Sequence, residues 1–230
     1  EVTPRARQAH DERQAIERAN RLARDHFVQN LFKHPAAERA RQYVRNRGFG
    51  AGVVRDFQLG FALDSWNDLL QALQRQGVPT SVLQRAGLAR PSDRGGLYDQ
   101  FRNRLIFPIV DVNDRVLGFG GRALDPDNPA KYLNSPETPL FHKRRTLYGL
   151  KQAHQAITEQ NRALIVEGYT DVLALHQAGV RNVVAGLGTA LTAEQLKLLS
   201  RYCEEIVFVY DGDSAGTQAA LRNLELLEIA

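Results

Sequence analysis

The chain has 230 residues, of which 43% are hydrophobic and 24% are charged, and its formal net charge at pH 7 is +4. These fractions are those of a folded globular protein and exclude a disordered or low-complexity chain. No run approaches the roughly 18 consecutive apolar residues that cross a membrane, so we expect no membrane partner. The single cysteine, Cys203, excludes an internal disulfide and a cysteine zinc cluster, which suits a reducing cytoplasm.

The charge is divided unevenly along the sequence. Residues 1–150 hold 24 basic and 16 acidic side chains, a net charge of +8, whereas residues 151–230 hold 6 and 10, a net charge of −4. A basic half joined to an acidic half favours a polyanionic partner beside a metal site. A solvated basic surface explains the charge alone equally well.

The first part of the chain predicts helices. Apolar periodicity indicates four of them, at 5–33, 36–47, 66–76 and 80–86. His34-Pro35 separates the first two. A short strand is expected at 57–63, and Asp64-Ser65 is placed to cap the third helix. We expect Trp66, the only tryptophan of the chain, to anchor the core of this region.

A link, a hairpin and a long loop follow. Residues 89–100 are rich in turn signals and predict an irregular link. Residues 101–110 and 116–122 predict the two strands of a hairpin. Because Pro108 has no N–H to donate, the first of these strands is expected at a sheet edge or at a bulge. Residues 125–148 predict an irregular loop, and loops of such length are usually functional or disordered.

From Leu150 onward, predicted strands and helices alternate. The strands are expected at 163–166, 182–185 and 206–210, and the helices at 150–160, 170–178, 192–203 and 214–227. Such alternation is typical of a parallel sheet flanked by helices, the α/β class. We therefore predict a basic, mixed α+β N-terminal domain at 1–149 and a second, Rossmann-like α/β domain at 150–230.

Two acidic motifs follow two of the predicted parallel strands. Glu167-Gly-Tyr-Thr-Asp171 comes after the first, and Asp211-Gly-Asp213 after the third. Carboxylates at the C-terminal ends of parallel strands face the crevice where open α/β sheets bind ligands. Several carboxylates gathered there predict a divalent-metal site, and Mg²⁺ with phosphate is the chemistry that hard oxygen ligands favour. Asp171 can alternatively cap the following helix.

Basic, aromatic and amide side chains lie in the predicted hairpin and its loop. Basic side chains neutralise phosphate, and aromatic rings stack on unpaired nucleobases. Asparagine forms hydrogen bonds with nucleobase edges or phosphates. They predict a nucleic-acid or nucleotide interface made of Arg102, Arg104, Arg122, Lys131, Tyr132, Asn134 and Lys143. For any one of these basic side chains, the alternative is that it is only solvated at the surface. The six histidines show no metal-ligand spacing, and we expect them on surfaces or helices.

The two acidic motifs together resemble a Toprim domain, which occurs in bacterial primases, topoisomerases and some nucleases. The segments 101–109, 118–122, 131–143 and 147–150 are similar to the catalytic core of bacterial DnaG-type primases, and the similarity extends over nearly the whole chain. The resemblance implies Mg²⁺ or Mn²⁺ as cofactor. It implies that the catalytic and metal-binding residues are Glu167, Asp211 and Asp213.

The resemblance also implies a nucleotidyltransferase. Such a DNA-directed RNA polymerase makes RNA primers from ribonucleoside triphosphates on single-stranded DNA, releases pyrophosphate and acts at the cytoplasmic replication fork. The family has a zinc-binding N-terminal domain, a third acidic motif and a C-terminal domain for the replicative helicase, and we find none of them here. We therefore interpret the chain as an excised piece, deficient in metal binding and catalysis. The alternatives are a non-catalytic module that binds single-stranded nucleic acid, and a Toprim topoisomerase or nuclease.

Overall fold

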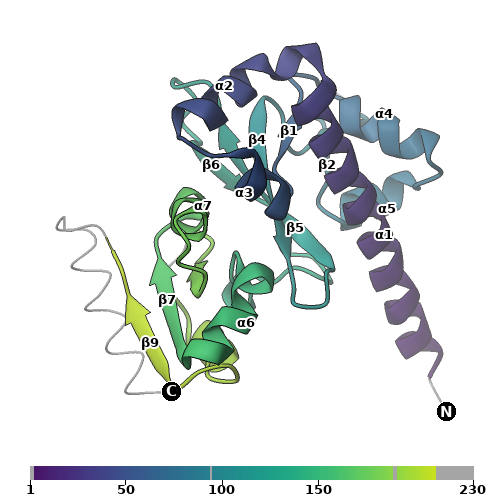
Figure 1. Ribbon diagram of the computed structural model, residues 1–230. Coiled ribbons are helices and arrows are strands. Elements are labelled where there is room, and N and C mark those ends of the chain that lie inside the picture. Colours follow the sequence, from purple (N-terminus) through teal and green to yellow (C-terminus); the bar gives the residue numbers. More distant parts are fainter. Residues whose placement is uncertain (1–2, 94, 189–190, 211–230) are drawn as a thin grey trace. The chain divides into compact units, whose positions relative to one another are not determined.

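The computed structural model describes residues 3–93, 95–188 and 191–210, which belong to two compact units. Unit 1 consists of Glu1–Gly48, Gln58–Ile109 and Arg115–Phe141, and unit 2 of Phe49–Phe57, Val110–Asp114 and His142–Ala230. Figure 1 shows the chain coloured along its sequence. The domain division predicted at residue 150 stays a prediction. Among the described residues, none of the helices has the length and apolar character needed to span a membrane.

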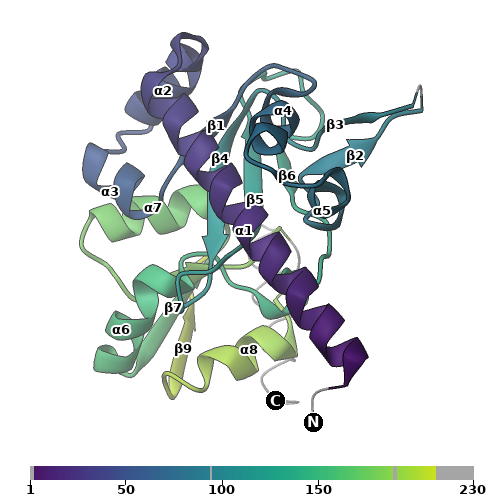
Figure 2. The same cartoon turned by 90° about the vertical axis from the view of Figure 1, so that its right-hand side faces the viewer.

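The centre of unit 1 is a four-stranded sheet with one long helix against it. The strand order is β1 (Gly60–Ala62), β4 (Arg104–Val110), β5 (Val116–Ala123) and β6 (Tyr132–Asn134). The predicted first helix is confirmed as α1, Pro4–Lys33, which runs along this unit in Figure 2. Its buried side chains recur every three or four residues, so one stripe of the helix faces the core: Ile16, Ala19, Ala23, Phe27 and Leu31.

A glycine sets the distance between α1 and the sheet. A Cβ atom at Gly60 would lie 2.5 Å from the Cβ atom of Phe27. Only glycine therefore lets β1 approach the helix this closely. The Phe27 ring then packs edge-on against Phe119, with ring centroids 5.5 Å apart, and against Phe101 at 6.5 Å. The close approach of β1 to α1 thus lets Phe27 pack with Phe101 and Phe119 in the aromatic core of unit 1.

The remaining elements of unit 1 are η1 (Pro35–Ala37), α2 (Glu38–Asn46), α4 (Asp68–Arg75), α5 (Thr80–Arg85), β2 (Ala89–Pro91) and β3 (Leu97–Asp99). The helix predicted at 66–76 begins only at Asp68. Neither Asp64 nor Ser65 caps that helix, because its N-cap residue is Asn67. Ser65 Oγ instead accepts a hydrogen bond from the Asn67 N–H at 3.3 Å. The link predicted at 89–100 is wrong in part, since β2 and β3 pair there as an antiparallel hairpin.

The position of β4 in the sheet differs from the prediction. β4 is not an edge strand, because it lies between β1 and β5 and is buried over its whole length. Pro108 is tolerated because β1 is short and pairs only with residues 104–106 of β4. The β1 ladder thus ends before Pro108, so no residue of β1 needs an N–H from Pro108.

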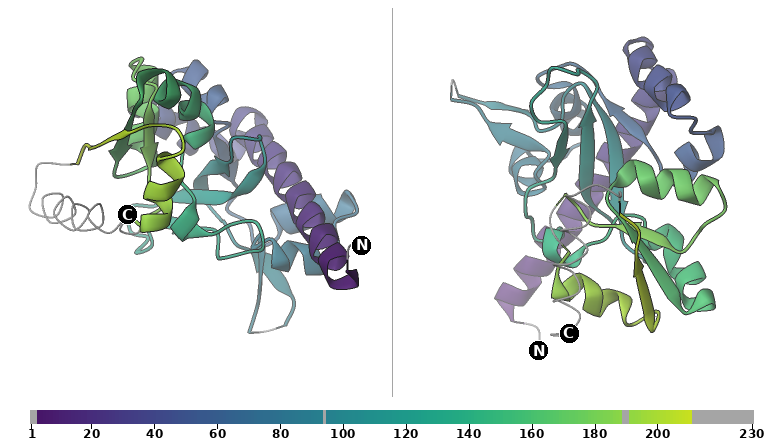
Figure 3. Two further views of the ribbon diagram at one scale, coloured as in Figure 1. Left: turned by 90° about the horizontal axis from the view of Figure 1, so that it is seen from below. Right: turned by 90° about the vertical axis from the view of Figure 1, so that its left-hand side faces the viewer.

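The centre of unit 2 is a parallel sheet, as the alternating sequence pattern predicted. The order is β8 (Val183–Ala185), β7 (Arg162–Val166) and β9 (Glu205–Phe208), and both pairings are parallel. The other elements are α3 (Ala51–Asp56), η2 (Lys143–Arg145), α6 (Leu150–Gln160), α7 (Tyr169–Gln177) and α8 (Ala193–Leu199). Figure 3 shows these strands and helices from two further sides. The helix predicted at 214–227 lies outside the described residues.

A local capping signal accounts for the start of α8 in unit 2. The Thr192 hydroxyl accepts a hydrogen bond from the Gln195 N–H, and the Gln195 side chain bonds back to the Thr192 N–H, a reciprocal cap at the start of α8. The core between helices and sheet includes Ile157 of α6 and Ile165 of β7. The buried Cys203 packs on the same core, although α8 ends at Leu199 and not at Cys203 as the predicted helix did. The short helix α3 was not predicted.

Candidate functional site

The first acidic motif lies at the C-terminal edge of the parallel sheet in unit 2. β7 ends at Val166, the exposed Glu167 follows, and α7 begins at Tyr169. The Gly168 N–H donates a hydrogen bond to Asp171 Oδ2 at 3.0 Å. Asp171 therefore caps α7, which is the alternative that its position at the helix start suggested. Glu167 remains the side chain of this motif at the strand end.

The second acidic motif follows β9, which lies beside β7. Their register pairs Ala163 with Ile206 and Ile165 with Phe208, and the Val209 N–H donates to the Ile165 carbonyl at 2.9 Å. The parallel ladder thus extends nearly to the ends of both strands. Asp211 and Asp213 lie outside the described residues. Within the part of the chain that is described, no three or more His, Cys, Asp or Glu side chains are grouped as metal ligands.

In unit 1, the β5–β6 pair holds an arginine between two tyrosines. Arg122 of β5 is directly opposite Tyr132 of β6, and its Nη1 donates to the Tyr132 hydroxyl at 2.8 Å. The guanidinium also lies 4.8 Å from the ring centroid of Tyr43 and 5.3 Å from that of Tyr132. Such stacking fixes the plane of the guanidinium. The structure thus brings two of the predicted residues together and adds Tyr43, which the sequence did not single out.

Two polar atoms of this arginine–tyrosine cluster are buried without a hydrogen-bond partner among the described residues. They are Arg122 Nε and the hydroxyl of Tyr43. Burial raises the pKa of Tyr43, so its hydroxyl stays protonated and can donate. Both atoms are donors, so the described part of the chain leaves two hydrogen bonds of this cluster unmade.

The two arginines at the start of β4 have different environments. Arg104 is buried, and its Nη1 donates to the carbonyl of Gly121 at 3.1 Å. Burial and the nearby Arg102 lower the pKa of Arg104. These contacts give Arg104 a part in joining β4 to β5. Arg102 lies just before the strand, and its Nη1 donates to the carbonyl of Asp99 at 3.1 Å.

Trp66 is exposed, which corrects the prediction that it anchors the core. It is 66% exposed because it lies in the loop before α4 rather than on the apolar face of that helix. The Arg102 guanidinium lies 4.1 Å from the Trp66 ring centroid, and the Tyr98 ring packs edge-on against Trp66 at 5.6 Å. These three residues, the Trp66 stack, line a hollow of about 570 Å³ with Pro91, Ser92 and Asp93.

The remaining predicted residues lie on β6 and in the segment after it. Lys131 is exposed just before β6, and its carbonyl accepts a hydrogen bond from the Ala123 N–H at 2.9 Å. Asn134 on β6 is paired with Gly120 of β5 and is half-buried. Lys143 lies in η2, which belongs to unit 2. The structure therefore groups Lys131 and Asn134 with Tyr132 on one short strand and its approach.

Comparisons with known proteins agree with this architecture. The family "DNA primase catalytic core, N-terminal domain" matches residues 26–154, and a Toprim-like family matches residues 164–230. DNA primases of Salmonella typhimurium and Pseudomonas aeruginosa are 46% and 47% identical over 199 and 204 residues. The matches cover 86% and 88% of this chain but only 34% and 31% of the relatives. The chain thus spans about a third of the length of the curated relatives it matches.

Two solved structures are similar over nearly the whole chain. A DnaG primase catalytic domain bound to single-stranded DNA aligns with a TM-score of 0.85 and 44% identity, covering 94% of this chain and 67% of that one. The RNA polymerase domain of Mycobacterium tuberculosis primase DnaG aligns with a TM-score of 0.87 and 40% identity, covering 93% and 71%. At such identities, both fold and residue correspondence are shared.

Proposed function

Since the chain belongs to the DnaG-type DNA primase family, we propose that its protein is a DNA-directed RNA polymerase that synthesises short RNA primers on single-stranded DNA. Ribonucleoside triphosphates are its substrates, and each addition releases pyrophosphate. The observation that carries this proposal is the β7–β9 pairing: the strand that leads to Glu167 is hydrogen-bonded in parallel to the strand that leads to Asp211 and Asp213. Carboxyl ends of neighbouring parallel strands meet at one sheet edge.

The proposed cofactor is a divalent cation, Mg²⁺ or Mn²⁺, held by Glu167, Asp211 and Asp213. The donor set fits, because carboxylate oxygens are the hard ligands that these cations prefer. A bound cation neutralises the charge that develops on the transferring phosphoryl group. The exposed Glu167 is positioned by the end of β7 and the start of α7, and Asp171 stabilises that turn through its bond to Gly168.

We propose that unit 1 contacts the template strand and the nucleotide phosphates. Arg122, held between Tyr43 and Tyr132, neutralises a phosphate together with Lys131. In unit 2, Lys143 contacts a phosphate separately. Asn134 contacts a base edge or phosphate, and the exposed Trp66 face stacks on an unpaired base. A similar catalytic domain bound to single-stranded DNA supports this assignment. Arg104 acts through the strands that it joins, since its guanidinium bonds Gly121.

In the whole protein, the family resemblance adds further partners to the proposal. A zinc-binding domain would precede this core, and a C-terminal domain would bind the replicative helicase. The protein would then act in the cytoplasm, at the replication fork. This part of the proposal rests on the resemblance and on the similarity to curated DNA primases.

Ribonucleotide incorporation on a single-stranded template tests the proposal. The chain is compared with a core completed at its C-terminus by the sequence that follows in a relative, and each is assayed with Mg²⁺ or Mn²⁺. We expect the completed core to make primers and its Glu167→Gln variant to make none. Glu159→Gln is the matched control, because Glu159 is also exposed in unit 2 but lies on α6. A completed core that binds DNA without incorporating nucleotides would instead indicate a non-catalytic binding module.

A further inference from the structure

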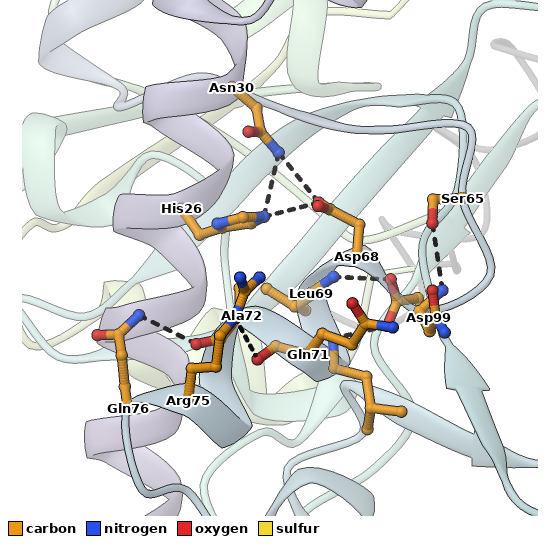
Figure 4. A network of polar contacts seen from close by, with 12 residues as sticks. His26, Asn30, Ser65, Asp68, Leu69, Gln71, Ala72, Arg75, Gln76 and Asp99 are labelled. Carbon is orange, nitrogen blue, oxygen red and sulfur yellow. Dashed lines mark hydrogen bonds and ion pairs between the residues drawn. The ribbon is translucent and has the colours of Figure 1, made fainter.

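A buried carboxylate caps α4 from another element. Asp99, at the end of β3, is 2% exposed. Its Oδ2 accepts a hydrogen bond from the Leu69 N–H and its Oδ1 from the Leu70 N–H, each at 2.9 Å (Figure 4). The N-cap residue of α4, Asn67, supplies no side-chain hydrogen bond. The first turn of α4 is therefore fixed by Asp99 rather than by its own flanking residues.

The backbone of Asp99 is bonded to the Trp66 stack. The Asp99 N–H donates to the Trp66 carbonyl at 2.8 Å, and the Asp99 carbonyl accepts from Arg102 Nη1 at 3.1 Å. Trp66 is also only two residues before α4, whose first turn holds the Asp99 carboxylate. One residue thus contacts the tryptophan loop, the arginine that lies over the indole, and the helix that follows the loop.

A second layer of polar contacts holds α4 from its other side. His26 Nε2 of α1 lies 2.7 Å from Asp68 Oδ2, and Asn30 Nδ2 donates to the same oxygen at 3.3 Å (Figure 4). Asp68 and His26 are ionisable side chains that act on the pKa of Asp99, which Asp68 raises and His26 lowers. This layer ties α4 to α1 and makes no contact with Trp66 among those described. Asp68 therefore offers a matched comparison with Asp99.

We infer that Asp99 is a positioning residue that holds Trp66 and Arg102 stacked and ready to receive an unpaired base. The inference rests on the proposed contact of Trp66 with single-stranded DNA. The indole is 66% exposed and lies in a short loop, so only Tyr98 and Arg102 pack against it rather than the core. Asp99 instead bonds the loop at the Trp66 carbonyl, the helix that follows the loop at Leu69 and Leu70, and Arg102, which keeps one face of the indole covered. An ordered ring has less freedom to lose when a base stacks on it.

The first test uses Trp66 as its own reporter, because it is the only tryptophan of the chain. Asp99→Asn keeps the shape of the side chain but replaces one acceptor oxygen by an NH₂ group, which cannot accept from an N–H. We expect lower fluorescence anisotropy and stronger acrylamide quenching of Trp66 in Asp99→Asn. The same chemical change in Asp68→Asn should leave both unchanged. Equal signals in Asp99→Asn and the unmodified chain would overturn the inference.

The second test is a double-mutant cycle on binding of an oligodeoxythymidine. Trp66→Ala should weaken binding by about 5- to 150-fold, the range of one base–aromatic stack. In a chain that keeps Trp66, Asp99→Asn should weaken binding by about twofold or more. In a chain that carries Trp66→Ala, it should have no further effect, since the effects of coupled residues on binding free energy are not additive. Additive effects would contradict positioning through Trp66. No effect of Trp66→Ala would reject the proposed base contact, and the fluorescence comparison would then decide the role of Asp99.

A third measurement needs no variant of Asp99. If the Asp99 cap and the DNA contact are coupled, the coupling acts in both directions. Adding the oligonucleotide to the unmodified chain should then slow hydrogen exchange of the Leu69 and Leu70 amides. These two N–H groups donate hydrogen bonds to the Asp99 carboxylate. The amides of Ala153 and Ile157 in α6 of unit 2 serve as controls and should not change. Unchanged exchange at Leu69 and Leu70 in a chain whose Trp66 fluorescence responds to DNA would overturn the inference.

Discussion

The buried Asp99 carboxylate should give unit 1 a stability that decreases as pH rises. Burial raises the pKa of Asp99 from 3.8 to about 6, although two backbone N–H bonds oppose the shift. The folded chain then binds the proton more tightly than the unfolded chain does. The stabilisation is complete below about pH 3.8 and is lost as pH rises through about 6.

The size of this effect follows from the pKa difference. At 1.36 kcal/mol per unit, the shift from 3.8 to about 6 corresponds to about 3 kcal/mol of unfolding free energy in total, of which about 2.4 kcal/mol is lost between pH 4 and pH 7.5. Asp99→Asn cannot titrate at this position, so its stability relative to the unmodified chain should improve by about 2.4 kcal/mol over that interval. Asp68 acts in the opposite direction and in another pH range, because its hydrogen bond with His26 lowers the pKa of Asp68. Its stabilisation is lost as pH falls below about 3.8, so the contribution of Asp68 stays nearly constant between pH 4 and pH 7.5.

Urea unfolding followed by Trp66 fluorescence measures this difference locally, because Trp66 is in unit 1. The free energy of unfolding is compared between the unmodified chain, Asp99→Asn and Asp68→Asn at half-unit steps from pH 4 to pH 7.5. Other titrating groups are common to the chains, so the differences isolate each carboxylate. If the free energy of unfolding varied with pH in the same way for Asp99→Asn and the unmodified chain, the reasoning would be refuted. Burial would then not outweigh the two N–H bonds in setting the pKa of Asp99.

Four further predictions concern single substitutions. Glu167→Gln in the completed core should reduce primer synthesis at least about a hundredfold without changing the circular dichroism spectrum, and full activity would remove Glu167 from the chemistry. Lys131→Ala should weaken binding of single-stranded DNA and reduce the slope of log K against log salt by about 0.7, and an unchanged slope would exclude a phosphate contact. Trp66→Ala should change the unfolding free energy by less than about 0.5 kcal/mol, because the side chain is 66% exposed. Gly60→Ala should destabilise unit 1 by about 1–3 kcal/mol in urea unfolding, because its Cβ would meet Phe27 at 2.5 Å.

Much of the candidate site could be predicted because local patterns carry it. A buried strand followed by Glu167-Gly and a helix start is a local signal, and the structure confirms that order for β7 and α7. The place of Arg122 opposite Tyr132 was not predicted, because register depends on the pairing of β5 with β6 across a loop. Tyr43 was missed for the same reason, since it reaches Arg122 from α2, far away in the sequence.

The sequence by itself determined the class of the fold, the basic and acidic halves, and the order of most helices and strands. It did so because helix and strand periods, caps and turn residues act over a few positions. Only the tertiary structure decided that Trp66 faces solvent, that Pro108 lies in a central strand, and that α4 takes its cap from Asp99. Each of these depends on which distant segments pack together, and the free energy of that packing exceeds the local preferences from which such positions were predicted.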